Sequence, residues 1–254
     1  EIMPSLVGSE MCIRDSRIFR LIYNSDKISR QEIADQLGLS LPTVNQNLKM
    51  LMEDGLIEYV GNFTSTGGRR AQAITIDNNA RKAISVNIKA DYINVDVVGL
   101  KGQIIYSMAV KAHFSKSRAY IEKLTDAVRH AVDYVGADAD DILGVGVTVP
   151  GILDDEKQIL ISAPPLKAKN YDFTRLISAI DYPVVVMNDA RAEAYADHWF
   201  NGKPEDEKIY IMLGEGVGGA YINASAIRNG VHNRGGEFGH MAVSYTHLRA
   251  HETR

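Results

Sequence analysis

Cysteine, long apolar runs and an N-terminal apolar leader are missing or nearly missing from this sequence. Its 254 residues include a single cysteine, Cys12. One thiol excludes a disulfide framework and a metal cluster held by cysteine thiolates. No apolar run approaches the roughly 20 residues that span a bilayer, and the first residues contain no signal-peptide core. These absences predict a cytoplasmic protein with no membrane partner and, within this chain, no metal or other cofactor.

A strong charge of either sign is also missing. The formal net charge is -4, which argues against a generally basic protein that coats nucleic acid. Between residues 17 and 70, seven Lys and Arg stand against six Asp and Glu, so this segment carries a charge of +1. DNA binding there would have to rest on local groups, with dimerisation multiplying weak half-site binding.

The chain is long enough for two ordinary domains. The turn-forming residues 77–79 separate a first domain at 17–78 from a second at 80–243. Residues 1–16 and 244–254 resemble translated sequencing-adapter read-through, and we expect both segments to be non-native. The fold of the second domain therefore has to be inferred from residues 80–243 alone.

Residues 29–51 have the pattern of a helix-turn-helix. Gly38 can adopt the positive φ that ends one helix, and the Ser40 hydroxyl can cap the next. An apolar stripe at helical spacing follows: Val44, Leu48 and Leu51. The polar residues between them are expected to face outward: Thr43, Asn45, Gln46, Asn47 and Lys49.

These outward residues suit the major groove of DNA. Asn and Gln amides pair with adenine, Thr contacts a thymine methyl, and Lys49 can meet guanine or phosphate. Residues 56–60 and 71–76 alternate like two strands, and Arg69 and Arg70 lie in the glycine-rich loop between them, as in a phosphate-binding wing. The alternative is a helical hairpin with a merely solvated polar face. The ordered succession of glycine, cap, stripe and wing favours DNA binding.

Strand and helix patterns alternate along residues 80–243. Strands are predicted at 82–88, 92–100, 103–112, 142–149, 159–162, 183–187 and 209–213. Helices are predicted at 117–135, 171–180 and 190–200. The fold class is therefore α/β, in which strand-to-helix junctions are the usual places for ligands.

Several motifs occur together and in order. They are the winged helix, its 65–69 loop, Val149-Pro150-Gly151, Asn188-Asp189-Ala190, the glycine loop at 214–219 and the Gly-Gly-Glu-Phe-Gly-His run at 235–240. On these motifs the sequence resembles the repressor, ORF and kinase (ROK) family, specifically its regulators of the xylose-repressor type, over nearly all of residues 17–243. The resemblance implies an actin-like, ribonuclease-H-type α/β domain whose lobes close on a sugar, here incomplete at its C-terminal side.

The resemblance also implies a sugar site in which Asn188 and Asp189 meet Glu237 and His240. Sugar hydroxyls donate and accept hydrogen bonds, so amide, carboxylate and imidazole groups suit them. In kinase relatives the aspartate matching Asp189 is the general base. A second role for Asp189, compatible with the first, is to cap a helix that begins at Ala190. The histidine matching His240 helps hold a structural zinc with three later cysteines, which this chain lacks; the zinc is expected only in an intact protein.

Two phosphate loops distinguish a kinase from a regulator within this resemblance. Active kinases carry an aspartate, two glycines and a threonine in the first loop. The matching residues here are Asn87, Lys89, Ala90 and Asp91. The second loop consists of Gly214, Glu215 and Gly216, with a carboxylate where kinases place a small hydroxyl residue. Carboxylates repel phosphate, so both loops predict that the protein is not an enzyme.

These features predict a sugar-responsive transcriptional regulator that represses carbohydrate-utilisation genes. Its partners would be operator DNA, a small sugar effector and further copies of the chain, in a homodimer or homotetramer. An ATP-dependent sugar kinase with a DNA-binding module is the alternative, motivated by Asp189. A third possibility is a non-specific DNA-binding or assembly protein without a ligand.

Overall fold

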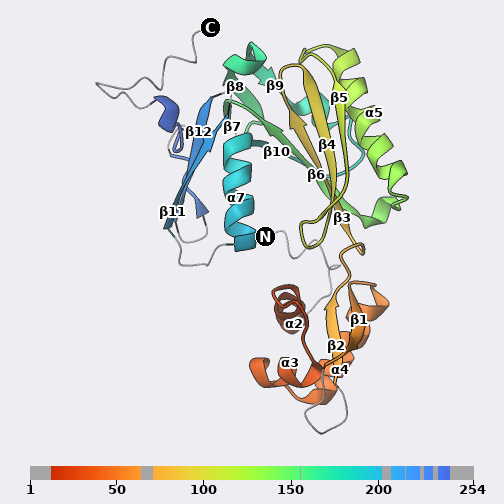
Figure 1. Cartoon of the computed structure of the whole chain (residues 1–254). Helices are drawn as coiled ribbons and strands as arrows, with labels where there is room; N and C mark the ends of the chain where they lie inside the picture. Colours follow the sequence, from red (N-terminus) through yellow and green to blue (C-terminus); the bar gives the residue numbers. More distant parts are fainter. Residues whose placement is uncertain are drawn as a thin grey trace. The chain divides into compact units, whose positions relative to one another are not determined.

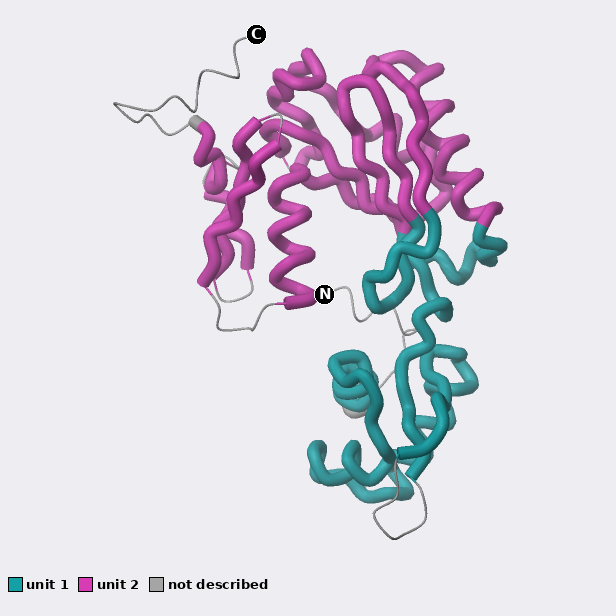
Figure 2. The backbone as a smooth tube through the Cα atoms, viewed as in Figure 1, with its two compact units in different colours: residues 1–83, 97–106, 135–143 teal, residues 84–96, 107–134, 144–254 magenta. Residues whose placement is uncertain are grey.

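The computed structural model describes residues 13–63, 71–154, 156–201, 207–214, 216–223, 226–230 and 234–240. The chain divides into two compact units (Figure 2). Unit 1 comprises Glu1–Ala83, Val97–Tyr106 and Val135–Leu143, and unit 2 comprises the rest. No helix in the described ranges is long and apolar enough to cross a membrane. Most of the two segments expected to be non-native, residues 1–12 and 244–254, lies outside the described residues, and that expectation stays a prediction.

The winged helix-turn-helix of unit 1 has the predicted order of elements (Figure 1). Its helices are α2 Ile13–Tyr23, α3 Arg30–Leu37 and α4 Leu41–Glu53, and its antiparallel strands are β1 Ile57–Asn62 and β2 Gln72–Ile76. The first helix begins at Ile13, four residues before the predicted start of the domain at Arg17. The wing stem closes where the Phe63 N–H donates to the Ala71 carbonyl at 2.9 Å.

Caps fix the corner between α3 and α4. Ser29 caps α3 and exchanges hydrogen bonds with Glu32 in a capping box. Gly38 ends the helix at φ +63°, and Ser40 caps α4 by accepting from the Thr43 N–H. The predicted stripe is confirmed: Val44, Leu48 and Leu51 are buried in one core with Ile18, Phe19, Ile22, Ile33, Leu56 and Ile74.

Unit 1 also takes in residues that follow the turn at 77–79. The tight turn after strand β4 (Tyr92–Gly99) packs Leu100 against the winged-helix core. The Leu100 N–H donates to the Asn78 carbonyl at 3.1 Å, and the Lys101 N–H donates to Asn78 Oδ1 at 2.9 Å. The core of the winged helix-turn-helix is therefore completed by residues that lie beyond the predicted boundary in sequence.

The largest sheet has the order β10-β6-β3-β4-β5. Its strands are β3 Lys82–Ile88, β4, β5 Ile104–Lys111, β6 Ile142–Val149 and β10 Val184–Asn188, and β10 runs parallel to β6. Helix α5, Arg118–Tyr134, lies alongside the sheet and buries Leu124, Val128 and Ala131 (Figure 1). All five strands and the helix were predicted.

The predicted helix at 171–180 is wrong. Residues Ala168–Asp172 form strand β9, and only Thr174–Ile177 form a helix, α6. Tyr171 pairs in register with Leu160 of β8, Ile159–Ala163, which also pairs with β7, Ile152–Asp154. Tyr171, in β9, and Phe173, just after it, are both buried, and their rings meet edge to face with centroids 4.7 Å apart.

The remaining elements surround helix α7, Asp189–Asn201. A three-stranded antiparallel sheet contains β11 Glu207–Leu213, β12 Val217–Asn223 and β13 Ala226–Ile227. Helix α7 packs on β10, β11 and β12, and the short helix η3, Phe238–His240, also packs on β12. The start of α7, with its sequence-predicted Asp189, is thus placed at the junction of these elements.

Candidate functional site

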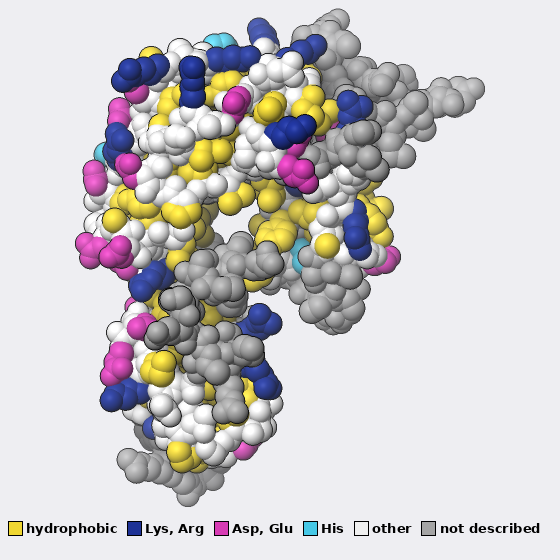
Figure 3. Space-filling view, turned by 180° about the vertical axis from the view of Figure 1, so that it is seen from behind, with side chains coloured by type: hydrophobic (Ala, Val, Ile, Leu, Met, Phe, Trp, Pro, Cys, Tyr) yellow, Lys and Arg dark blue, Asp and Glu magenta, His cyan; other side chains and the backbone are white. Residues whose placement is uncertain are grey.

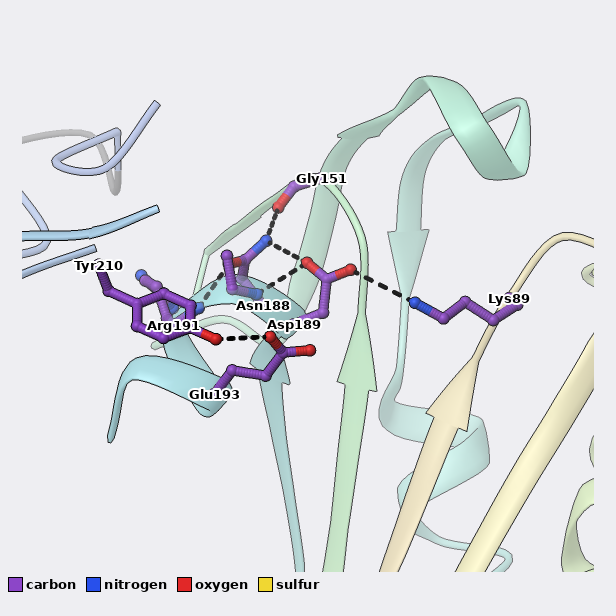
Figure 4. Close-up of polar contacts among 8 residues, drawn as sticks. Lys89, Gly151, Asn188, Asp189, Arg191, Glu193 and Tyr210 are labelled. Carbon is purple, nitrogen blue, oxygen red and sulfur yellow. Dashed lines mark hydrogen bonds and ion pairs between the residues drawn. The ribbon is translucent and has the colours of Figure 1, made fainter. Parts of the chain in front are cut away.

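The end of β10 and the start of α7 form a hydrogen-bonded junction (Figure 4). Asn188 lies opposite Val149 at the end of parallel strand β6. Its Nδ2 donates to the Gly151 carbonyl at 2.9 Å, and its Oδ1 accepts from the Arg191 N–H at 3.0 Å. Asn188 therefore caps the helix, and the expectation that Asp189 caps a helix beginning at Ala190 is wrong. Asp189 is instead the first residue of α7.

The Asp189 carboxyl is buried, with 5% of the residue exposed. Its Oδ1 accepts from the Ala190 N–H at 2.9 Å and from Asn188 Nδ2 at 3.2 Å. Its Oδ2 lies 3.9 Å from the Lys89 ammonium. Burial raises the pKa of Asp189, the Ala190 N–H and Lys89 act in the opposite direction, and Glu193 adds to the rise. Such a carboxyl takes up a proton more readily than an exposed aspartate does.

The first predicted phosphate loop is the turn between β3 and β4. The Lys89 N–H donates to the Tyr92 carbonyl at 3.0 Å and closes this turn. Asp91 is exposed and pairs with His113 Nδ1 at 2.8 Å. The side chain of Asn87 places its Oδ1 in a buried position without a hydrogen-bond partner in the described part of the chain. The structure therefore brings Lys89, and not Asp91, to Asp189, a pairing that sequence reasoning missed.

The second predicted loop closes the hairpin between β11 and β12. The Gly214 N–H donates to the Gly216 carbonyl at 3.0 Å, while Glu215 lies outside the described residues. Gly219 lies in β12, where a Cβ would come 2.6 Å from the Tyr210 carbonyl oxygen and would also meet the Phe238 ring. Close packing in the strand explains this glycine without a phosphate.

The other two predicted sugar ligands lie in the segment that ends the described chain. Glu237 is half-buried in the turn before η3, and the side chain of His240 lies outside the described residues. Helix η3 and helix α7 both pack on β12, which brings this segment and the Asp189 junction to the same strand. The convergence of all four side chains on one sugar remains a prediction.

A second carboxylate on α7 was not predicted from the sequence. The Tyr210 hydroxyl of β11 donates to Glu193 Oε2 at 2.9 Å (Figure 4). Burial raises the pKa of Tyr210, and the bond to Glu193 adds to the rise. Glu193 lies one helical turn after Asp189, a spacing that could have identified it as a neighbour.

On helix α4, Asn45, Gln46 and Lys49 are exposed as predicted, and Thr43 is half-buried. The expectation that Asn47 faces outward is wrong: it is 7% exposed, and its Nδ2 donates to the Thr43 carbonyl at 2.9 Å. Asn47 lies three residues after Val44 and so falls on the buried stripe.

Arg30 is a basic residue on this surface that sequence reasoning missed. Its guanidinium donates to Asn45 Oδ1 at 3.4 Å and to Gln72 Oε1 at 2.9 Å. Arg69 and Arg70 lie outside the described residues. Figure 3 shows Lys and Arg side chains interspersed with Asp and Glu over the winged module, on the face that it draws. On that face the described residues of the module form no broad basic patch.

Comparison with known proteins agrees with both halves of this description. A family model described as "ROK family" matches residues 83–251, and a winged helix-turn-helix DNA-binding model matches residues 13–58. The xylose repressor of Bacillus subtilis (strain 168) is 26% identical over 237 residues, which cover 92% of this chain and 61% of the repressor. The DNA-binding transcriptional dual regulator NagC of Escherichia coli (strain K12) is 24% identical, over 94% of this chain and 59% of NagC. The chain thus spans about three fifths of the length of these relatives.

Solved structures show the same fold. A ROK family transcriptional regulator, a homolog of the E. coli MLC protein, superposes with a TM-score of 0.65 at 20% identity, over 92% of this chain and 58% of that one. A ROK family glucokinase from Streptomyces griseus, in complex with glucose and AMPPNP, superposes with a TM-score of 0.52 at 30% identity, over 64% of this chain and 51% of the glucokinase. Because the family model matches more than half of its residues, the chain belongs to the ROK family, and it carries an N-terminal winged helix-turn-helix.

Proposed function

We propose that the protein is a sugar-responsive repressor of carbohydrate-utilisation genes that acts in the cytoplasm. The observation that carries this proposal is the presence, in one chain, of a fully capped helix-turn-helix and a buried carboxylate at a strand-to-helix junction. The name of one relative, the xylose repressor of B. subtilis, likewise joins a sugar with repression.

The DNA half of the proposal assigns base reading to the exposed residues of α4. Asn45 and Gln46 present amides suited to adenine, and Lys49 presents a cation suited to guanine or phosphate. Thr43 at the start of the helix would contact a thymine methyl, while Arg69 and Arg70 of the wing would contact phosphates. Two such modules in a homodimer or homotetramer would read a pseudo-palindromic operator, whose half-site spacing tolerates little displacement.

The sugar half assigns different tasks to Asn188 and Asp189. Asn188 uses its amide internally, toward Gly151 and Arg191, and so orients the junction. Asp189 keeps one oxygen, Oδ2, for a ligand hydroxyl, because Oδ1 already accepts two donors. Glu237 and His240 would complete the sugar site from the neighbouring segment. A sugar that binds two forms of the protein unequally would change operator affinity by a coupling free energy of about 1–3 kcal/mol.

The proposal is tested in two steps. A randomised DNA library is selected on the protein to obtain a preferred site, and binding to that site is measured by fluorescence anisotropy against a panel that includes xylose, glucose and N-acetylglucosamine. We expect one sugar to shift the DNA affinity, and Asp189→Ala to remove the shift while leaving DNA binding intact. Asn45→Ala should relax the preference at one base pair, whereas Arg69→Ala should weaken binding equally on all sequences. Absence of both sequence preference and sugar response would favour a non-specific DNA-binding protein.

A sugar kinase is the alternative, because Asp189 has the raised pKa of a general base and because the chain is similar to a glucokinase. Against it stands the Lys89 ammonium, which faces the carboxylate that would have to take a proton from the sugar. A coupled assay with ATP, magnesium and the sugar panel separates the two functions. If the wild-type protein phosphorylates a sugar and Asp189→Asn abolishes this turnover, the protein is a sugar kinase.

A further inference from the structure

Lys89 and Asp189 face each other without a direct hydrogen bond. The ammonium nitrogen lies 3.9 Å from Asp189 Oδ2, beyond the usual hydrogen-bond distance. The Lys89 side chain is 34% exposed and that of Asp189 is 7% exposed, so the gap opens from a buried carboxylate toward the surface. Since Oδ1 accepts from Ala190 and Asn188, Oδ2 is the oxygen of this carboxylate that faces the gap.

The size of the gap suits one bridging hydroxyl group. An oxygen placed about 2.8 Å from both Nζ and Oδ2 would see the two atoms at an angle of about 90°. That angle is about 20° smaller than the tetrahedral angle between the O–H bond and a lone pair of a hydroxyl group, a bend that both hydrogen bonds tolerate. A hydroxyl can therefore donate to Asp189 and accept from Lys89 at the same time, which an ether oxygen or a C–H group cannot do.

Two further buried oxygens lie on the neighbouring strands β3 and β6. Asn87 Oδ1 and Thr148 Oγ1 have no hydrogen-bond partner within the described ranges. Asn87 is near the end of strand β3, two residues before Lys89, which directly follows the strand. Thr148 is paired in register with Met187, two residues before Asp189. Buried polar atoms are normally paired, so each of these two oxygens is available to a water molecule or to a polar ligand.

We propose that Lys89 and Asp189 form a two-point clamp for a single hydroxyl group of the effector, and that Lys89 determines specificity for a ligand bearing that hydroxyl. This inference rests on the proposed sugar-binding function of the junction. Lys89 acts as the donor, and Asp189 acts as the acceptor. Lys89 thus replaces a glycine of the kinase phosphate loop and, in addition, takes part in ligand recognition.

The test combines protein variants with ligand variants in isothermal titration calorimetry. The effector found in the sugar panel is compared with its monodeoxy and deoxyfluoro analogues, because fluorine accepts weakly and cannot donate. On the wild-type protein, one ring position should lose at least about tenfold in affinity on either replacement, as expected for hydrogen bonds to charged groups. In Lys89→Met the affinity for the parent sugar should fall by about tenfold or more, and the deoxy penalty at that position alone should shrink by a similar factor.

A matched control is Lys123→Met, which makes the same change on the exposed surface of α5, where Lys123 Nζ donates to the Lys111 carbonyl. It should leave both the parent affinity and the deoxy penalty unchanged. Lys89→Gln keeps a neutral donor and replaces Lys89→Met as the test variant if Lys89→Met lowers the melting temperature. Its deoxy penalty, the loss of affinity when the hydroxyl is removed from the sugar, should lie between those of wild type and Lys89→Met. An equal loss on every analogue, or no loss at all, would overturn the clamp. Failure of every sugar to bind the wild-type protein would instead overturn the proposed function.

Discussion

Replacing Asn47 with leucine is expected to stabilise the protein and to leave its DNA preference unchanged. Asn47 is 7% exposed, its Oδ1 has no hydrogen-bond partner in the described part of the chain, and its Nδ2 bonds to the Thr43 carbonyl. A buried unpaired acceptor costs about 1–3 kcal/mol, whereas the lost hydrogen bond contributed about 1 kcal/mol. Leucine branches at the same carbon and gains about 0.5 kcal/mol of helix propensity. The free energy of unfolding should therefore rise by about 1 kcal/mol or more.

Urea denaturation followed by far-ultraviolet circular dichroism measures this change as a shift in midpoint at constant slope. The matched control is Asn45→Leu, at an exposed position of the same helix. It should gain only the propensity difference of about 0.5 kcal/mol, and it should lose preference at one base pair in the selected DNA site. Unchanged stability in Asn47→Leu together with relaxed DNA preference would refute the reasoning and place Asn47 in the groove.

Three further outcomes follow from burial and close packing. Leu48→Ala, at a 2% exposed core position, should lower the free energy of unfolding by about 3 kcal/mol in the same denaturation assay. Gly219→Ala should cost about 1–3 kcal/mol, because the new Cβ would lie 2.6 Å from a carbonyl oxygen of β11, whereas Gly214→Ala meets no atom within 4 Å and should be nearly neutral. Because burial raises the pKa of Asp189, its contribution to stability is present below the unfolded pKa and is lost as pH rises through the folded pKa. Asp189→Asn should remove that decline from a plot of melting temperature against pH.

Features set by neighbouring residues could be predicted from the sequence. Ser29, Gly38 and Ser40 act where local capping rules place them, and the stripe of α4 follows from a spacing of 3.6 residues. The same periodicity, applied strictly, would have placed Asn47 inside. The helix expected at 171–180 failed because Tyr171 pairs with Leu160, a contact that local spacing does not specify.

The position of Asn188 and Asp189 in the candidate site could be predicted from the sequence, but the residues that contact them could not. Asn188 and Asp189 follow an apolar strand, and that pattern alone placed them at a strand-to-helix junction. Lys89 is a hundred residues away in sequence, and only the order of the strands in the sheet brings it to Asp189. Tyr210 reaches Glu193 in the same way, from a strand that packs on α7. Long-range pairing of this kind depends on topology, which residue spacing does not encode.

A last prediction concerns how the DNA-binding module is held within unit 1. The Tyr23 hydroxyl at the end of α2 donates to the Leu100 carbonyl at 2.8 Å, and the Lys101 ammonium donates to the Ser25 carbonyl at 3.0 Å. One bond runs from the end of α2 to Leu100, and the other runs from Lys101 back to Ser25, just after α2. Together they hold the turn after β4 against the end of the first helix. Each bond should contribute about 1 kcal/mol.

Removing both bonds in Tyr23→Phe/Lys101→Met should speed hydrogen exchange at the amides that end α2, without changing DNA affinity, because α4 and its caps are untouched. If the sugar signal passes through this turn, the double variant should also lose most of the sugar-induced shift in DNA affinity. Lys27→Met, at an exposed position close to the same helix end, is the matched control and should behave like wild type. A double variant with faster exchange but a full sugar response would show that the turn supports the module's stability and plays no part in its regulation.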